Sequence, residues 1–118
     1  MLATLARLLR KAPPEPTWLE VATLRTRMAG EPAPLVIDVR GPDEFEGPLG
    51  HIEGSRNIPL PDLTAHAAEI AGAGRPIVCV CLTDKRSAAA AAQLSAAGVR
   101  EVSVLRGGMK AWREAGAP

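Results

Sequence analysis

The residues best suited to chemistry in this chain form one short run that follows an apolar segment. Cys81 ends the apolar segment, and the run continues as Leu82-Thr83-Asp84-Lys85-Arg86-Ser87. Backbone N–H groups and a helix amino terminus close to a thiol favour its thiolate form, which is the nucleophile. We therefore predict that Cys81 is a reactive thiol. The loop that binds its substrate would comprise Leu82, Thr83, Asp84, Lys85, Arg86 and Ser87.

The second thiol, Cys79, lies inside the apolar segment, two residues before Cys81. A free cysteine is most often a buried apolar residue, and we expect this role for Cys79. Cys81 differs because it stands at the end of the segment, beside a polar and cationic loop. The two thiols are too close in the chain for an unstrained disulfide, and without a nearby histidine they make a poor metal site.

Alternating strand and helix patterns surround these cysteines. We expect strands at 34–40, 57–58, 77–82 and 101–105, and helices at 17–29, 41–46, 62–71, 88–97 and 108–115. A capping box of Thr17 and Glu20 predicts the start of the first helix, and Asp62 is the predicted cap of the third. The uniformly apolar run 77–82 is typical of a central strand covered on both faces. The alternation predicts an α/β sandwich with a mostly parallel sheet and ligands at the carboxyl ends of its strands.

Two charged residues, Asp38 and Arg40, lie at the carboxyl end of the strand predicted at 34–40. We expect both residues to help position the reactive loop without contacting the substrate themselves. For Asp38 we favour an ion pair with Arg40 or with Arg86 over a direct part in catalysis.

Length and composition limit the classes of function. The 118 residues are enough for one domain, and the net charge of +1 with only 3% aromatic residues argues against nucleic-acid binding. No apolar run approaches the ~20 residues that a membrane-spanning helix needs. We expect a cytoplasmic monomer that binds neither nucleic acid nor membrane.

The first sixteen residues are predicted to be an appendage to a domain at 17–118. Within 1–11, leucines at positions 2, 5 and 8 or 9 share one helical face, and three cationic residues lie elsewhere. A proline-rich linker ends this amphipathic segment at residue 16. We favour a helix that packs on the domain or frays over a membrane or partner anchor, and assign the segment no function.

Three blocks of sequence together resemble the rhodanese-like domain family. The first joins 35–40 and 43–45 to Gly50-His51-Ile52-Glu53-Gly54-Ser55-Arg56-Asn57-Ile58-Pro59-Leu60, and the second is the run 81–87. The third is Leu105-Arg106-Gly107-Gly108-Met109-Lys110-Ala111-Trp112 with 116–118. The resemblance extends from about residue 17 to residue 118 and implies a three-layer α/β/α sandwich with a mostly parallel central sheet.

The resemblance implies sulfur transfer through a cysteine persulfide. Cys81 would take sulfane sulfur from thiosulfate, a persulfide or a polysulfide and pass it to cyanide or a thiol, a protein thiol included. The backbone amides of 82–86 would cradle the persulfide, Arg86 would shape the loop, and His51 would hold a neighbouring loop by hydrogen bonding. No metal or organic cofactor is required.

One departure from the family concerns Asp84, which stands where many members have glycine. Aspartate tolerates a left-handed backbone, so the loop shape is expected to survive, but a carboxylate there disfavours thiosulfate relative to a persulfide or polysulfide. Two other classes of function stay open. One is a non-enzymatic sulfur carrier or redox-sensing module. The other, less favoured, is a cysteine phosphatase or arsenate reductase, whose loops between cysteine and arginine are longer.

Overall fold

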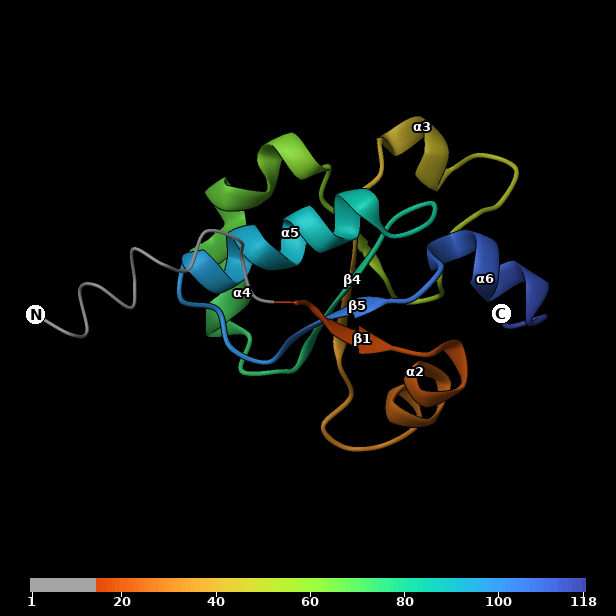
Figure 1. Cartoon of the computed structure of the whole chain (residues 1–118), viewed down its shortest axis with the longest axis horizontal. Coiled ribbons are helices and arrows are strands. Elements are labelled where there is room, and N and C mark those ends of the chain that lie inside the picture. The colour runs from red at the N-terminus through yellow and green to blue at the C-terminus, as the bar shows by residue number, and fades with distance from the viewer. Residues whose placement is uncertain (1–14) are drawn as a thin grey trace, which may run out of the picture.

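The computed structural model describes residues 15–118, and in that part of the chain five parallel strands form one sheet (Figure 1). The sheet order is β1-β5-β4-β2-β3. The strands are β1 (Thr17–Leu19), β2 (Leu35–Asp38), β3 (Arg56–Asn57), β4 (Ile77–Val80) and β5 (Val102–Leu105). The predicted α/β class and the central place of the 77–82 run are confirmed. The amphipathic segment predicted at 1–11 lies outside the described residues.

Helices cover both faces of the sheet and make the three predicted layers. One apolar cluster joins one face to the 3-10 helix η1 (Leu60–His66), α4 (Ala67–Gly72) and α5 (Lys85–Ala96). A second cluster joins the other face to α2 (Val21–Met28) and α6 (Gly108–Glu114). The short helix α3 (Pro42–Phe45) follows the carboxyl end of β2. None of the helices in residues 15–118 has the length and apolar character needed to cross a lipid bilayer.

The central strand is apolar throughout because both of its faces are covered. Ile77 and Cys79 pack into the cluster below α4 and α5, together with Cys81, the residue after the strand. Val78 and Val80 pack into the cluster below α2 and α6. This alternation is that of a strand, whose side chains point to opposite faces in turn. It places the two thiols on the α5 side of the sheet, with Cys81 at the strand's carboxyl end.

The helix predicted at 17–29 is wrong in its first four residues. Thr17 and Leu19 pair with β5 in parallel register, and α2 begins only at Val21. Glu20 does flank the helix, but its carbonyl accepts the first helical N–H while its side chain binds Arg106 instead of completing a capping box. Pairing with the edge of β5 satisfies backbone groups that a helical turn would otherwise have satisfied.

Other boundaries differ from the predicted ones by smaller amounts. Asp62 does not cap a helix, because it lies within η1, and α4 begins at Ala67. The strand predicted at 57–58 lies at 56–57, and α5 begins at Lys85 instead of residue 88. The loop after Cys81 is therefore shorter than predicted, since Lys85, Arg86 and Ser87 already belong to the first turn of α5.

A buried ion pair ends β2. Arg40 donates from Nε to Asp38 Oδ1 at 2.9 Å and from Nη2 to Asp38 Oδ2 at 2.7 Å, and each of the two residues is only 1% exposed. The same guanidinium donates to the carbonyl oxygens of Glu44 at 3.1 Å and Gly50 at 2.7 Å. Of the two partners predicted for Asp38, the structure has Arg40. This one side chain ties β2 to α3 and to the turn beyond it.

We predict that Arg40→Ala lowers the free energy of unfolding by about 3–5 kcal/mol, because it leaves the carboxylate of Asp38 buried without its partner. Denaturant unfolding of the variant measures this loss. The control is Arg56→Ala, which breaks an exposed ion pair with Glu69 and should cost about 1 kcal/mol or less. Similar losses in the two variants would contradict the importance of the buried pair.

Candidate active site

The thiol of Cys81 lies directly after the central strand, where β4 gives way to the turn that leads into α5. Cys81 is 1% exposed, whereas Leu82 in the same turn is 39% exposed and Thr83 and Lys85 are also exposed. The predicted loop therefore places its sulfur inside and most of its other side chains outside.

The amino terminus of α6 holds the backbone of this turn. Met109 N donates to the carbonyl oxygen of Cys81 at 2.9 Å, and Lys110 N donates to that of Leu82 at 3.1 Å. The first N–H groups of a helix have no partner within it, so these carbonyls satisfy two of them. The contact binds the loop to a helix that lies some 25 residues later in the chain.

Gly108 makes this close approach possible. A Cβ atom at Gly108 would lie 2.3 Å from the carbonyl oxygens of Cys81 and Thr83 and 2.7 Å from that of Leu82, and the residue has a left-handed φ of 56°. All three carbonyls are therefore directed at the start of α6. In a trans peptide the N–H points opposite to the C=O, so the N–H groups of residues 82–84 are directed away from α6. Such a row of N–H groups on one side of a turn is suited to stabilising an anion.

Ser87 contacts the sulfur from the first turn of α5. Its N–H donates to Cys81 Sγ at 3.3 Å, and its hydroxyl oxygen lies 3.3 Å from Sγ and 3.2 Å from the carbonyl oxygen of Asp84. Ser87 is fully buried, so both groups act where water does not compete. The positive end of the α5 dipole also faces the sulfur. Ser87 was predicted only as one member of the loop, and the structure makes it the residue of that loop in hydrogen-bond contact with the thiol.

Arg86 binds Glu44 of α3 through two hydrogen bonds. Nη1 lies 2.7 Å from Glu44 Oε1 and Nη2 lies 2.9 Å from Oε2. The hydrogen bonds to Arg86 are the main reason why the pKa of Glu44 is lowered to about 2, and the same contact raises the pKa of Arg86. Arg86 therefore does not pair with Asp38, the carboxylate considered as its partner from the sequence. Glu44 was not predicted as a site residue, although it lies in a motif block of the family.

Three contacts fix α3 beside the loop. The carboxylate of Glu44 accepts a hydrogen bond from Arg86, and its carbonyl oxygen accepts one from Arg40. His51 Nδ1 lies 2.9 Å from the carbonyl oxygen of Phe45, and the two rings stack with centroids 3.6 Å apart. The prediction that His51 holds the neighbouring segment by a hydrogen bond is confirmed. Together these contacts hold α3 in position next to the first turn of α5.

Asp84 has a φ of −152°, so the loop does not use the left-handed conformation that was expected to be tolerated there. Its carbonyl oxygen accepts a hydrogen bond from Ala88 N at 2.9 Å and so begins the hydrogen bonding of α5. The glycine that many family members have at this position is not required by the backbone seen here. Aspartate fits because the left-handed positions of this site, Gly107 and Gly108, lie on the other side of the loop.

Cys79 is fully buried, and burial, with a smaller contribution from Cys81, raises the pKa of its thiol to about 12. Both cysteines are free thiols, as predicted. Within residues 15–118, no three His, Cys, Asp or Glu side chains gather closely enough to hold a metal ion. Cys79 therefore lies deep in the sheet, and Cys81 is the thiol that meets the loop.

Comparison with known proteins agrees with this arrangement. The model of the family described as "Rhodanese-like domain" matches residues 20–115. YqhL of Bacillus subtilis is 44% identical over 84 residues, which are 71% of this chain and 64% of YqhL. The thiosulfate sulfurtransferase GlpE of Pseudomonas aeruginosa (strain LESB58) is 36% identical over 99 residues, covering 82% of this chain and 86% of GlpE. The chain spans less than two thirds of YqhL, and 46% and 45% of two further curated relatives.

A solved structure with the same fold comes from Rhodopseudomonas palustris, a protein of unknown function described as a possible tyrosine phosphatase. It superposes with a TM-score of 0.79 at 27% identity and covers 86% of this chain and 83% of that one. The two chains therefore share the arrangement of sheet and helices.

We predict that Gly108→Ala lowers the free energy of unfolding by about 2–5 kcal/mol, from the left-handed backbone and from the clash with the loop carbonyls. Gly116→Ala is the matched control, because Gly116 has a φ of 70° but no atom within 4 Å of the place that a Cβ would take. It should cost only about 1–2 kcal/mol. Equal losses in denaturant unfolding would show that the carbonyl contacts do not matter.

We predict that Glu44 contributes to stability above about pH 4.5 and that this contribution disappears as the pH falls toward 2. The direction follows because the pKa of Glu44 is about 2 in the folded protein against 4.5 ordinarily, so folding favours the ionised form. Glu44→Gln should cost about 1 kcal/mol or less at neutral pH, since the pair is partly exposed.

The measurement is denaturant unfolding of the parent and Glu44→Gln at several values between pH 7 and 2. The gap in stability between them should close as the pH falls. Glu46→Gln, at an exposed carboxylate just after the same helix, serves as the control and should show no such gap. A gap that stays constant down to pH 2 would refute the assignment to the Glu44 and Arg86 pair.

Proposed function

The chain belongs to the rhodanese-like domain family, and from this premise we propose that it is a sulfurtransferase that carries sulfane sulfur on Cys81. The observation that carries the proposal is the position of Cys81 Sγ, 3.3 Å from the N–H of Ser87 at the positive end of α5. Positive helix ends and backbone N–H groups favour a thiolate over a thiol and a persulfide anion over its protonated form. Sulfur transfer needs both of these anions in turn.

In the first step, the thiolate of Cys81 attacks the outer sulfur of the donor. A bond forms between the two sulfur atoms while the donor's own bond to that sulfur breaks, and its electron pair leaves with sulfite, when thiosulfate is the donor, or with a thiolate. The product is the Cys81 persulfide. No external oxidant or reductant is needed, since the transferred sulfur brings its oxidation state with it.

In the second step, cyanide or an acceptor thiolate attacks the outer sulfur of the persulfide. The new bond forms to that sulfur, the sulfur–sulfur bond breaks, and Cys81 recovers its electron pair as the thiolate. The negative charge stays close to the same place throughout. The N–H of Ser87 and the N–H groups of the turn stabilise it without reorganising between steps.

The charged side chains near the loop have a different part in this proposal. Arg86 is fully engaged with Glu44, so its charge is largely balanced and it shapes the loop, as the family resemblance implied. Lys85 is exposed and has an acidic neighbour in Asp84. Backbone dipoles are therefore the main stabilisers of the sulfur anion.

These features bear on the donor. The name of the GlpE relative makes thiosulfate one candidate. Because Cys81 is buried, a donor must present a single terminal sulfur atom, which thiosulfate, persulfides and polysulfides all do. The carboxylate of Asp84 disfavours the dianion thiosulfate relative to the others. We propose a persulfide or polysulfide as the better donor and a small thiol or a protein thiol as the acceptor, in a cytoplasmic monomer that needs no cofactor.

A phosphatase is the second candidate, because one structural neighbour is described as a possible tyrosine phosphatase. Two observations make it the weaker one. Four residues separate Cys81 from Arg86, which gives a short loop for a tetrahedral oxyanion. Arg86 also has both of its terminal nitrogens on Glu44, so neither is free to bind a phosphate oxygen.

We predict that reduced protein gains about 32 Da, one sulfur atom, after incubation with glutathione persulfide or polysulfide, and to a lesser extent with thiosulfate. Intact-protein mass spectrometry measures the gain, and peptide fragmentation locates it on Cys81. Cys81→Ser should gain nothing. Cys79→Ala should gain sulfur as the parent does, which separates the two thiols.

The same samples distinguish the other functions. A parent that gains sulfur but gives no thiocyanate with cyanide, and passes sulfur only to a protein thiol, would be a carrier without small-molecule turnover. No gain from any donor, with the thiol of Cys81 shown to be free, would refute sulfur transfer. Hydrolysis of an aryl phosphate that is lost in Cys81→Ser would then favour the phosphatase.

A further inference from the structure

Leu82 is the one exposed large apolar side chain in residues 15–118. It is 39% exposed, and it directly follows Cys81 in the turn between β4 and α5. Every other leucine of these residues packs into one of the two apolar clusters. Leu35, Leu60, Leu63 and Leu94 pack into the cluster below α4 and α5, and Leu19, Leu24, Leu49 and Leu105 pack into the cluster below α2 and α6. Leu82 belongs to neither cluster, so the core does not account for an apolar residue at this position.

The backbone of Leu82 is held in place although its side chain is exposed. Its carbonyl oxygen accepts a hydrogen bond from Lys110 N at 3.1 Å, and a Cβ at Gly108 would lie 2.7 Å from the same oxygen. The side chain therefore extends from a fixed point next to the residue that carries the sulfur, since neighbouring Cα atoms are about 3.8 Å apart. A side chain on a fixed turn contacts a reactant without the cost of ordering the loop.

The position of Leu82 bears on the molecules that react with Cys81. Because Cys81 is 1% exposed, an acceptor must bring its own sulfur into the turn, while the carbon atoms attached to that sulfur stay at the entrance. A leucine there has neither a charge nor a hydrogen-bonding group, and it gains free energy only by covering apolar surface. A carboxylate on the acceptor would be poorly placed beside Leu82 and near the acidic Asp84. The entrance therefore suits an acceptor with an apolar chain.

The small extent of this apolar surface favours a small molecule over a protein. One partly exposed side chain offers far less than the roughly 800 Å² that each partner buries in a stable protein interface. A short alkyl chain, in contrast, needs no more surface than one leucine side chain provides.

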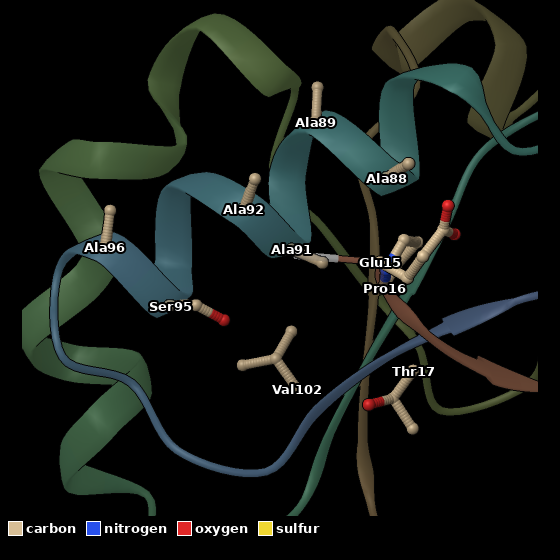
Figure 2. A pocket seen from close by; sticks show the side chains of 10 residues that line it. All are labelled: Glu15, Pro16, Thr17, Ala88, Ala89, Ala91, Ala92, Ser95, Ala96 and Val102. Carbon is tan, nitrogen blue, oxygen red and sulfur yellow. The ribbon is translucent and has the colours of Figure 1, made fainter. Parts of the chain in front are cut away.

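A second apolar surface lies along α5 and provides a comparison. It is a groove of about 720 Å³ whose lining includes Ala88, Ala92, Ala96 and Val102 (Figure 2). Ala96 lies at the end of α5 away from Ala88 and from the first turn, which carries Ser87. The lining, all of it within residues 15–118, contains no cysteine. A thiol bound in this groove would therefore have no persulfide to attack.

We propose that Leu82 selects a small thiol with an uncharged, apolar chain as the acceptor of the sulfur on Cys81, an inference that rests on the proposed sulfur transfer. The acceptor thiolate attacks the outer sulfur of the Cys81 persulfide, and a new sulfur–sulfur bond forms as the bond to Cys81 Sγ breaks. The electron pair of the broken bond stays on Cys81 as the thiolate, and the acceptor leaves as an alkyl persulfide. The alkyl chain lies against Leu82 during the attack.

The test measures how fast different thiols remove sulfur from the loaded protein. Reduced protein is loaded with inorganic polysulfide, separated from it by gel filtration and mixed with ethanethiol, 1-propanethiol or 1-butanethiol, and intact-protein mass spectrometry follows the loss of about 32 Da. A methylene covered on one side should raise the rate constant about twofold, so 1-butanethiol should react about fourfold faster than ethanethiol. 3-Mercaptopropionate, which has the chain length of 1-propanethiol and a carboxylate, should react more slowly than 1-propanethiol.

Three variants locate the effect. Leu82→Ser removes the apolar surface, and the ratio of the 1-butanethiol rate to the ethanethiol rate should fall to about one. Leu82→Met restores an apolar side chain of similar size and should restore the ratio to about fourfold. The control is Ala96→Arg, which puts a charge into the groove along α5 and should leave the parent's ratio unchanged. Each ratio compares two acceptors on one loaded protein, so differences in loading cancel.

The outcomes separate this proposal from the sulfur transfer on which it rests. A parent that loads sulfur but discharges it equally fast to all three alkanethiols would overturn the selection by Leu82 alone. A fourfold ratio that persists in Leu82→Ser, or that is lost in Ala96→Arg, would overturn it too by assigning the chain to another surface. A parent that gains no sulfur from any donor would overturn the proposed function, and this proposal with it.

Discussion

The contact between the start of α6 and the turn after β4 is the constraint on which the site depends. Three consecutive carbonyl groups of that turn are directed at α6, and a residue with a Cβ atom at position 108 could not come so close to them. Once the carbonyls face one way, the planarity of the peptide forces the N–H groups the other way. The turn then has an electropositive side before any charged side chain is considered. Cys81 and the first turn of α5 complete the arrangement from the ends of the same loop.

The charged side chains around the site form a balanced series. Asp38 pairs with Arg40, Arg40 also binds the carbonyl of Glu44, and the carboxylate of Glu44 binds Arg86. Each guanidinium group faces an oxygen partner, so the series fixes the ends of β2, α3 and α5 relative to one another while adding little net charge. The positive group in direct contact with Cys81 Sγ belongs to the backbone, since the N–H of Ser87 lies 3.3 Å from the sulfur.

The sequence predicted the parts of this site that depend on local pattern. The uniformly apolar run 77–82 predicted a central strand, and the cysteine at its end, followed by a cationic run, indicated the loop. The residues that hold the loop from outside were harder to predict. Glu44 and Arg86 are 42 residues apart, and nothing in either neighbourhood shows that α3 and α5 will meet. From the sequence, Asp38 could pair with Arg40 or with Arg86, and only the folded structure shows that Arg40 is the partner.

The helix predicted at 17–29 was wrong in its first four residues for a related reason. Thr17 and Glu20 have the types and spacing of a helix start, and a local pattern favours a helix from residue 17. The backbone of residues 17–19 instead pairs with β5, which lies more than 80 residues later in the chain. Local propensity is a weak preference, and a partner strand with unpaired backbone groups outweighs it. One long-range contact therefore decides both the fifth strand of the sheet and the point at which α2 begins.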